Sequence, residues 1–148
     1  MNRNSSTIAA LALALFFGTS AFAQDAKLTL VALDGRNGKP LPVQRLLVFM
    51  GESPKDVQLH RHSLDVTTDN DGVAVLPITS ADIKWIQVFV DFRTLCQTEP
   101  NLKSFSVREI ISTGVTTPNN CGSFRRDAAP NHFIVFARPA TLREKMER

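Results

Sequence analysis

The sequence predicts an all-β fold, and two of its features carry this expectation. In residues 66–78, two runs of β-branched or aliphatic side chains flank Asp69-Asn70-Asp71-Gly72, a tetrad that favours a tight turn. Apolar and polar residues alternate along residues 27–33 and again along residues 84–92, which is typical of strands with one buried face. We therefore expect an antiparallel β-sandwich in which residues 66–78 form a hairpin.

The first 23 residues predict an export signal. A head with Arg3 is followed by an apolar run over residues 8–17 and by the small-residue exit Ala21-Phe22-Ala23. The apolar run is too short to anchor the chain in a bilayer, and no later stretch is long and apolar enough to span one. Since position 24 is Gln rather than Cys, a lipid anchor is not expected. We expect cleavage after Ala23 and a secreted or periplasmic mature protein.

Length and charge predict one domain with no nucleic-acid partner. Loss of the signal removes one basic residue, so 17 basic residues become 16 against 14 acidic ones, a net charge of +2. These charges are spread along the chain, without the clustered basic face that nucleic acids require. The remaining chain of about 125 residues suits a single core. We expect a sandwich over residues 24–138 and a tail over residues 139–148.

The two cysteines, Cys96 and Cys121, predict a disulfide bond. An even pair in an exported chain is typical of a structural bridge, and closing this loop stabilises the fold by about 3 kcal/mol in the chain-entropy model. Two buried free thiols are the alternative. A nucleophilic cysteine paired with a histidine has no local signature in this sequence.

Turn residues and the alternation of apolar residues define the early strands. Residues 34–40 are rich in turn formers, so they connect the strand at 27–33 to a nearly continuous apolar run at 43–50. That run predicts a central strand covered on both faces. Residues 56–68 predict a further strand. Its apolar residues change from odd to even positions, which indicates a bulge near Arg61.

The later half predicts two more strands. Along residues 84–92, Ile86, Val88, Val90 and Phe92 lie on one side and Trp85, Gln87, Phe89 and Asp91 on the other, which predicts a half-buried strand that continues to Leu95. Residues 97–102 are expected to form a loop. Residues 132–138 predict a final buried strand.

Two short helices are expected. Ser106 and Glu109 have capping-box spacing, and Gly114 stands where a helix would stop, so we expect the domain's only internal helix here. Thr141 and Glu144 repeat the spacing in the tail, where Leu142 and Met146 share a face. That helix is too short to be stable alone, so it either packs on the sandwich or frays.

Two segments resemble a known family. The stretch Gly35-Arg36-Asn37-Gly38-Lys39-Pro40-Leu41-Pro42-Val43, followed by Thr67-Thr68-Asp69-Asn70-Asp71-Gly72-Val73-Ala74-Val75, resembles the pattern of carboxypeptidase-regulatory-like domains. The resemblance covers roughly the first half of the mature chain and implies a seven-stranded, Ig-like or transthyretin-like sandwich. The later half is similar to small exported bacterial proteins of unassigned function. The resemblance implies a noncatalytic accessory or binding module. We expect its partner to be a protein or glycan of the cell envelope, and we expect no cofactor.

An enzyme is not expected. No set of acid, base and nucleophile stands out. The hydroxyisourate-hydrolysing enzymes of the transthyretin-like group require a terminal tyrosine motif, and this chain has no tyrosine.

The histidines suggest the alternative function, a zinc or copper site. His60-Arg61-His62 would place two imidazoles on one face of a strand, and His132 would supply a third ligand. In the structural alternative these histidines lie at the sheet rim or pair with Asp56 or Asp65. The tetrad at 69–72 lacks the alternate carboxylates and closing Glu of a calcium loop, so we interpret it as a turn.

Two aromatic segments are candidate contact surfaces. Phe124 precedes Arg125 and Arg126 just after the second cysteine, where an arginine beside an exposed ring could bind a sugar or an acidic polymer. The alternative is a solvated loop with the ring packed inward. An exposed Trp85 would suggest carbohydrate stacking, whereas we expect it in the core.

Overall fold

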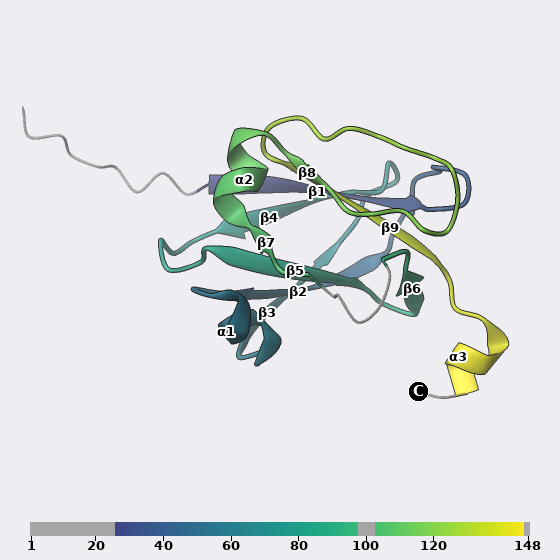
Figure 1. The fold of residues 1–148 in the computed structure, drawn as a ribbon, viewed down its shortest axis with the longest axis horizontal. Helices are drawn as coiled ribbons and strands as arrows, with labels where there is room; N and C mark the ends of the chain where they lie inside the picture. The colour runs from purple at the N-terminus through teal and green to yellow at the C-terminus, as the bar shows by residue number, and fades with distance from the viewer. Residues whose placement is uncertain (1–25, 98–102, 147–148) are drawn as a thin grey trace, which may run out of the picture.

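The computed structural model describes residues 26–97 and 103–146, which form two β-sheets packed face to face (Figure 1). The expected export signal with its cleavage after Ala23, residues 98–102 of the expected loop, and the last two residues of the tail lie outside this part. None of the helices in the described part is long and apolar enough to cross a membrane.

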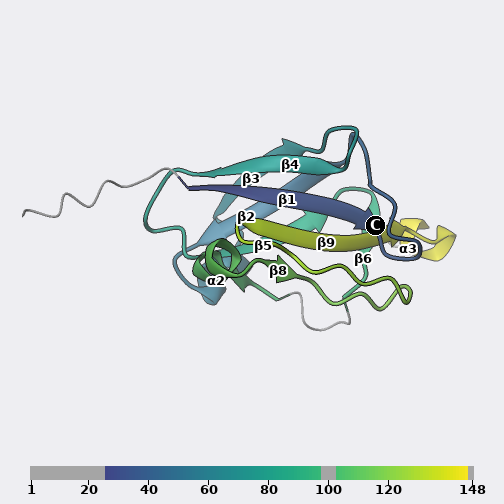
Figure 2. The same cartoon turned by 90° about the horizontal axis from the view of Figure 1, so that it is seen from above.

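The first sheet, sheet A, is built around β9. Its path is β4-β1-β9-β6, and β8 also pairs with β9. Both β1 and β8 run parallel to β9, so the sheet is mixed rather than purely antiparallel. Figure 2 shows β4, β1 and β9 side by side. Its strands are β1 (Ala26–Asp34), β4 (Val73–Ile78), β6 (Arg93–Leu95), β8 (Val115–Thr116) and β9 (His132–Pro139).

The second sheet, sheet B, is antiparallel with the order β3-β2-β5-β7. The apolar run at 43–50 supplies β2, which is a central strand as expected. The strands of this sheet are β2 (Arg45–Gly51), β3 (His62–Thr67), β5 (Trp85–Val90) and β7 (Phe105–Ser106).

The core lies between the sheets. Alternate residues of the longer strands point inward, and the large buried side chains include Leu28, Leu30, Leu46, Val48, Leu76, Ile86, Phe133 and Val135. The all-β sandwich is thus confirmed. The described residues contain nine strands rather than seven, and the finer Ig-like or transthyretin-like assignment stays a proposal.

The predicted hairpin at residues 66–78 is wrong, although its turn is present. Asp69 accepts hydrogen bonds at its side-chain oxygen from the backbone N–H groups of Asp71 and Val73, both at 2.9 Å, and Gly72 has φ 73°. The strands on either side do not pair, because β3 joins β2 in sheet B whereas β4 joins β1 in sheet A. The turn therefore carries the chain from one sheet to the other.

A second crossing between the sheets corrects the predicted strand at 84–95. The strand β5 ends at Val90, and β6 begins at Arg93 in sheet A. Phe92 lies in the crossing with φ 55° and is 80% exposed, so the prediction that it shares one side of the strand with the buried Ile86, Val88 and Val90 is wrong. The alternation ends where the chain changes sheets.

A helix, α1 (Pro54–Gln58), replaces the first part of the strand predicted at 56–68. Ser53 and Asp56 form a capping box, and Pro54 occupies the first helical turn. The change of apolar phase comes from the end of this helix and from His60 at φ 52°, not from a bulge at Arg61. The prediction that the domain has only one internal helix is wrong for the same reason.

The two predicted helices are confirmed. Ser106 caps α2 (Val107–Ser112) by accepting the N–H of Glu109 at 3.5 Å, and Gly114 follows with φ 78°. In the tail, Thr141 and Glu144 form the expected reciprocal capping contacts of α3 (Leu142–Met146). Glu144 also binds Arg138 of β9 through two hydrogen bonds of 2.8 and 2.9 Å, which ties the tail to the sandwich.

Candidate binding groove on the outer face of sheet B

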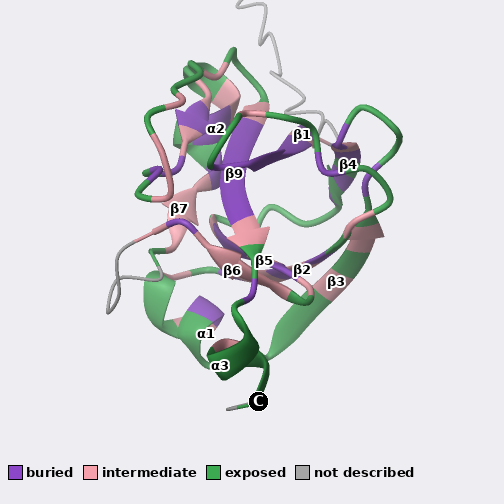
Figure 3. Cartoon of the chain, turned by 90° about the vertical axis from the view of Figure 1, so that its right-hand side faces the viewer, coloured by how far each residue is buried: buried purple, intermediate pink, exposed green. Residues whose placement is uncertain are grey.

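The outer face of sheet A is covered along β1 and β9. A second apolar cluster lies there, formed by Val31, Leu33, Ile134 and Phe136 together with Cys96. The loop between β8 and β9 packs over these residues through Phe124 and Ala128, above the sheet in Figure 1. In Figure 3, β9 is buried along most of its length. Both faces of these two strands are therefore closed.

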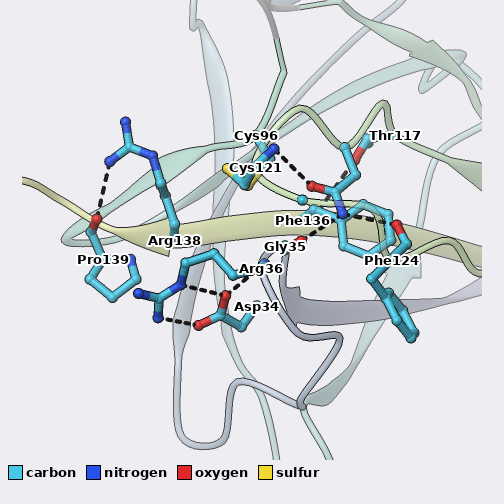
Figure 4. The surroundings of a disulfide bond; sticks show 12 residues. Asp34, Gly35, Arg36, Cys96, Thr117, Cys121, Phe124, Phe136, Arg138 and Pro139 are labelled. Carbon is cyan, nitrogen blue, oxygen red and sulfur yellow. Dashed lines mark hydrogen bonds and ion pairs between the residues drawn. A yellow bond between two sulfur atoms is a disulfide. The ribbon is translucent and has the colours of Figure 1, made fainter.

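The disulfide holds this covering loop in place. Cys96 and Cys121 are bonded as predicted, with their Cα atoms 5.3 Å apart (Figure 4). Asn119 donates to the carbonyl oxygens of Gly35 (2.7 Å) and Phe124 (3.0 Å). A side chain at Gly35 would place its Cβ 2.5 Å from the sulfur of Cys96, so only glycine fits under the bridge.

The outer face of sheet B is covered over only half its length. Val57 of α1 is fully buried, and α1 packs against β2 and β5. Gln87 points outward in the pattern of β5 but is only 4% exposed, since this half of the sheet is closed. The prediction that β2 is covered on both faces is wrong for its other half, where Leu47 and Phe49 are only partly buried.

The uncovered half forms an open groove of about 790 Å³. Its floor consists of Leu47 and Phe49 from β2 and Phe89 from β5. His60 closes one end by stacking on Phe49, with ring centroids 3.9 Å apart and planes inclined by 21°. Phe89 meets Phe49 edge-on at 5.5 Å. The floor is therefore an aromatic and aliphatic surface that solvent can reach.

Ion pairs line the rim of the groove. Arg45 binds Asp65 of β3 and lies 3.5 Å from Asp91, while Arg138 and Glu144 form the pair at the far end. Asp65 raises the pKa of Arg45 through a side-chain hydrogen bond, and the hydrogen bonds from Arg138 hold the pKa of Glu144 well below its ordinary value. The charges of these ion pairs offset one another, which favours a ligand without a large net charge.

Two residues of the groove have backbone conformations that are unfavourable for their side chains. His60 and Phe92 both line it, and both have positive φ, 52° and 55°. Such positions cost of order 1–3 kcal/mol each and tend to occur at functional sites. Phe92 is also almost fully exposed, so neither burial nor backbone preference accounts for a phenylalanine there.

Two oxygen atoms at the far end of the groove have no hydrogen-bond partner within the described residues. They are the side-chain oxygens of Thr94 and Gln97, and both are shielded from solvent. Buried polar atoms in native proteins are nearly always satisfied.

The structure does not bring the three predicted metal ligands together. His60 precedes β3 and stacks on Phe49, His62 begins β3, and His132 begins β9 in the other sheet, where its Nδ1 lies 2.9 Å from the carbonyl oxygen of Pro130. Within residues 26–97 and 103–146, no three His, Cys, Asp or Glu side chains lie close enough to hold a metal ion. The proposed partners Asp56 and Asp65 bind Ser53 and Arg45 instead.

The two aromatic candidates outside the groove, Phe124 and Trp85, both pack against other parts of the fold. Phe124 packs inward against Phe136, with ring centroids 6.1 Å apart, and Arg125 donates to carbonyl oxygens of its own loop. Trp85 is partly buried beside α2's capping residue Ser106 and belongs to neither core cluster. The expectation that Trp85 lies in the core is thus only partly met.

In the sequence, the signal for the groove is an aromatic residue on the polar side of a strand. Phe89 stands on the side of its strand that also carries Asp91, and an apolar ring on a solvent-facing side indicates a surface with a partner. Leu47 and Phe49 lie in an apolar run that is equally typical of a strand covered on both faces. Only the position of α1 separates these two interpretations.

Comparison with known proteins adds no assignment: no protein-family model, curated protein or solved structure matches this chain.

Proposed function

We propose that this protein is a noncatalytic binding module of the extracytoplasmic space and that it binds its partner in the groove on the outer face of sheet B. The observation that carries the proposal is the uncovered apolar floor of Leu47, Phe49 and Phe89 inside a rim of paired charges. An exposed apolar patch with a polar rim is the usual form of a binding site.

The surroundings of the groove support binding rather than catalysis. Its carboxylate Glu144 is held by Arg138, whose hydrogen bonds keep the pKa of Glu144 well below its ordinary value and oppose a role as proton donor. His60 is stacked on a ring rather than hydrogen-bonded to a nucleophile. The partner classes that suit the proposed location are proteins and glycans of the cell envelope, and the resemblance to carboxypeptidase-regulatory-like domains agrees with an accessory role.

The experiment compares binding by matched variants of the mature protein. Leu47→Lys places a charge on the groove floor, while Val75→Lys makes the same change at a 55% exposed position on the outer face of sheet A. Each variant is titrated with envelope glycan fragments and with fractionated envelope proteins. We expect Leu47→Lys to abolish binding and Val75→Lys to retain it. Equal binding by both variants would contradict the groove, and substrate turnover lost on a single substitution would contradict a noncatalytic role.

A further inference from the structure

We propose that the groove also binds a second copy of this chain, so that two molecules close each other's grooves through Phe92. This inference deepens the proposed function, since it concerns the regulation of the same site.

The first argument is that a projecting side chain and a hollow lie on one face. Phe92 is 80% exposed at one end of the groove, and the floor of Leu47 and Phe89 lies beside it. In a two-fold dimer, the same patch of each copy meets the other. A rotation that brings Phe92 of one copy onto the floor of the partner must therefore bring the partner's Phe92 onto the first floor.

The second argument is the rigid presentation of Phe92. The side chain of Gln44 bridges the crossing on either side of it, donating to the carbonyl oxygen of Asp91 at 2.7 Å and accepting from Nε of Arg93 at 2.7 Å. The backbone at Phe92 is thereby held at φ 55°, an unfavourable conformation for an aromatic residue. Strained residues tend to occur at functional sites, and an exposed ring gains from burial in a contact between molecules.

The third argument is charge. The groove and its ion pairs contain three arginines (Arg45, Arg93 and Arg138) and three carboxylates (Asp65, Asp91 and Glu144), so the face has no net charge. Two copies can therefore approach without mutual repulsion. An anionic lipid surface, by contrast, would be attracted by an excess of cations.

The size of the contact predicts a weak and reversible dimer. Two phenylalanine rings and two short floors bury an area on the order of 1,000 Å², at the low end for specific interfaces. Since the dimer covers the groove, self-association and partner binding must compete. Increasing protein concentration should lower the apparent affinity for a partner.

Sedimentation velocity tests the proposal on the mature protein at about 5 to about 500 µM, the range in which weak interfaces dissociate. We expect a concentration-dependent monomer–dimer equilibrium that Phe92→Asn and Leu47→Lys each weaken by at least about tenfold. Val75→Lys, which changes an exposed apolar residue on the outer face of sheet A, should leave it unchanged. Because asparagine tolerates positive φ, Phe92→Asn should fold at least as stably as the wild type, and thermal melting checks this.

Isotope-filtered NMR on a mixture of labelled and unlabelled protein detects the contact between the two copies directly. Nuclear Overhauser effects between the Phe92 ring of one copy and the Leu47 methyl groups of another are expected. A monomer at every concentration would overturn the proposal, and so would a dimer that Val75→Lys but not Phe92→Asn disrupts.

If the protein stays monomeric and Leu47→Lys still abolishes partner binding, self-association fails while the proposed function stands. If Leu47→Lys dissociates the dimer but leaves partner binding intact, the proposed function fails alone.

Discussion

The outer faces of the two sheets look alike in sequence but differ in structure. Along β1 and β9, the outward-facing Leu33 and Phe136 are at most 1% exposed, because a loop held by the disulfide packs over them. The outward-facing Leu47 and Phe49 of β2 have no such cover. One face serves as a second core and the other is a solvent-accessible surface. An apolar residue's role in this fold therefore depends on which segment returns to cover it.

The first test of this difference removes the disulfide bond that holds the covering loop on sheet A. Replacing both Cys96 and Cys121 with alanine should lower the free energy of unfolding by about 3 kcal/mol, because the loop loses its covalent constraint. Urea denaturation measures the loss. Hydrogen exchange should show that protection falls chiefly in residues 115–137, on the sheet A side. An equal loss of protection in β2 and β5 would contradict separate roles for the two faces.

The second test removes the cover on sheet B. Val57→Ala should lower the free energy of unfolding by about 2 kcal/mol, since it leaves a cavity beneath α1. Leu59→Ala, at a half-exposed position directly after the helix, is the matched control and should cost less than about 0.5 kcal/mol. Similar losses of unfolding free energy in the two variants would show that packing of α1 does not stabilise sheet B.

Acid should weaken the sheet A side through Asp34. This carboxylate accepts from Arg36 at 2.6 and 3.0 Å, and the hydrogen bonds hold its pKa below the ordinary 3.8. Because the folded-state pKa is the lower one, the stabilisation is complete above the unfolded-state value and is lost as the pH falls through the folded one. The loss should be smaller than that in Val57→Ala, since the guanidinium is half exposed. Urea midpoints measured down to about pH 2 should fall less steeply in Asp34→Asn than in the wild type; equal slopes would contradict this role.

The smallest effect has the opposite sign. Phe92→Asn should raise the free energy of unfolding by about 0.5 kcal/mol, because asparagine adopts positive φ more readily and an exposed ring loses little on removal. Thermal melting at low protein concentration measures the change without a contribution from self-association. A clear destabilisation would mean that Phe92 supports the fold rather than a contact.

Local signals in the sequence predicted local structure well. The turn at 69–72, the caps at Ser106 and Thr141, and the pairing of Cys96 with Cys121 are all confirmed. The turn and the caps depend only on residues close together in the sequence. The disulfide prediction depends on the oxidising compartment that the expected export signal implies. Ser53-Pro54 with Asp56 carries the same kind of signal for α1, whereas the alternation of Val57 and Leu59 is typical of a strand.

Sheet membership could not be predicted in this way. A period of two shows which side chains share a face, but it does not show which sheet a strand joins. The expected hairpin and the expected strand from 84 to 95 both failed at places where the chain changes sheets. The groove was missed for the same reason, since its floor is defined by the half of sheet B that α1 leaves uncovered.

Solvent paramagnetic relaxation enhancement tests the contrast between the two faces most directly. Leu33 and Leu47 are the same residue type at outward-facing positions of β1 and β2. With a soluble gadolinium chelate and dilute protein, the methyl groups of Leu47 should relax strongly while those of Leu33 remain unaffected. Equal protection of the two leucines would show that sheet B has no open face and would contradict the binding groove.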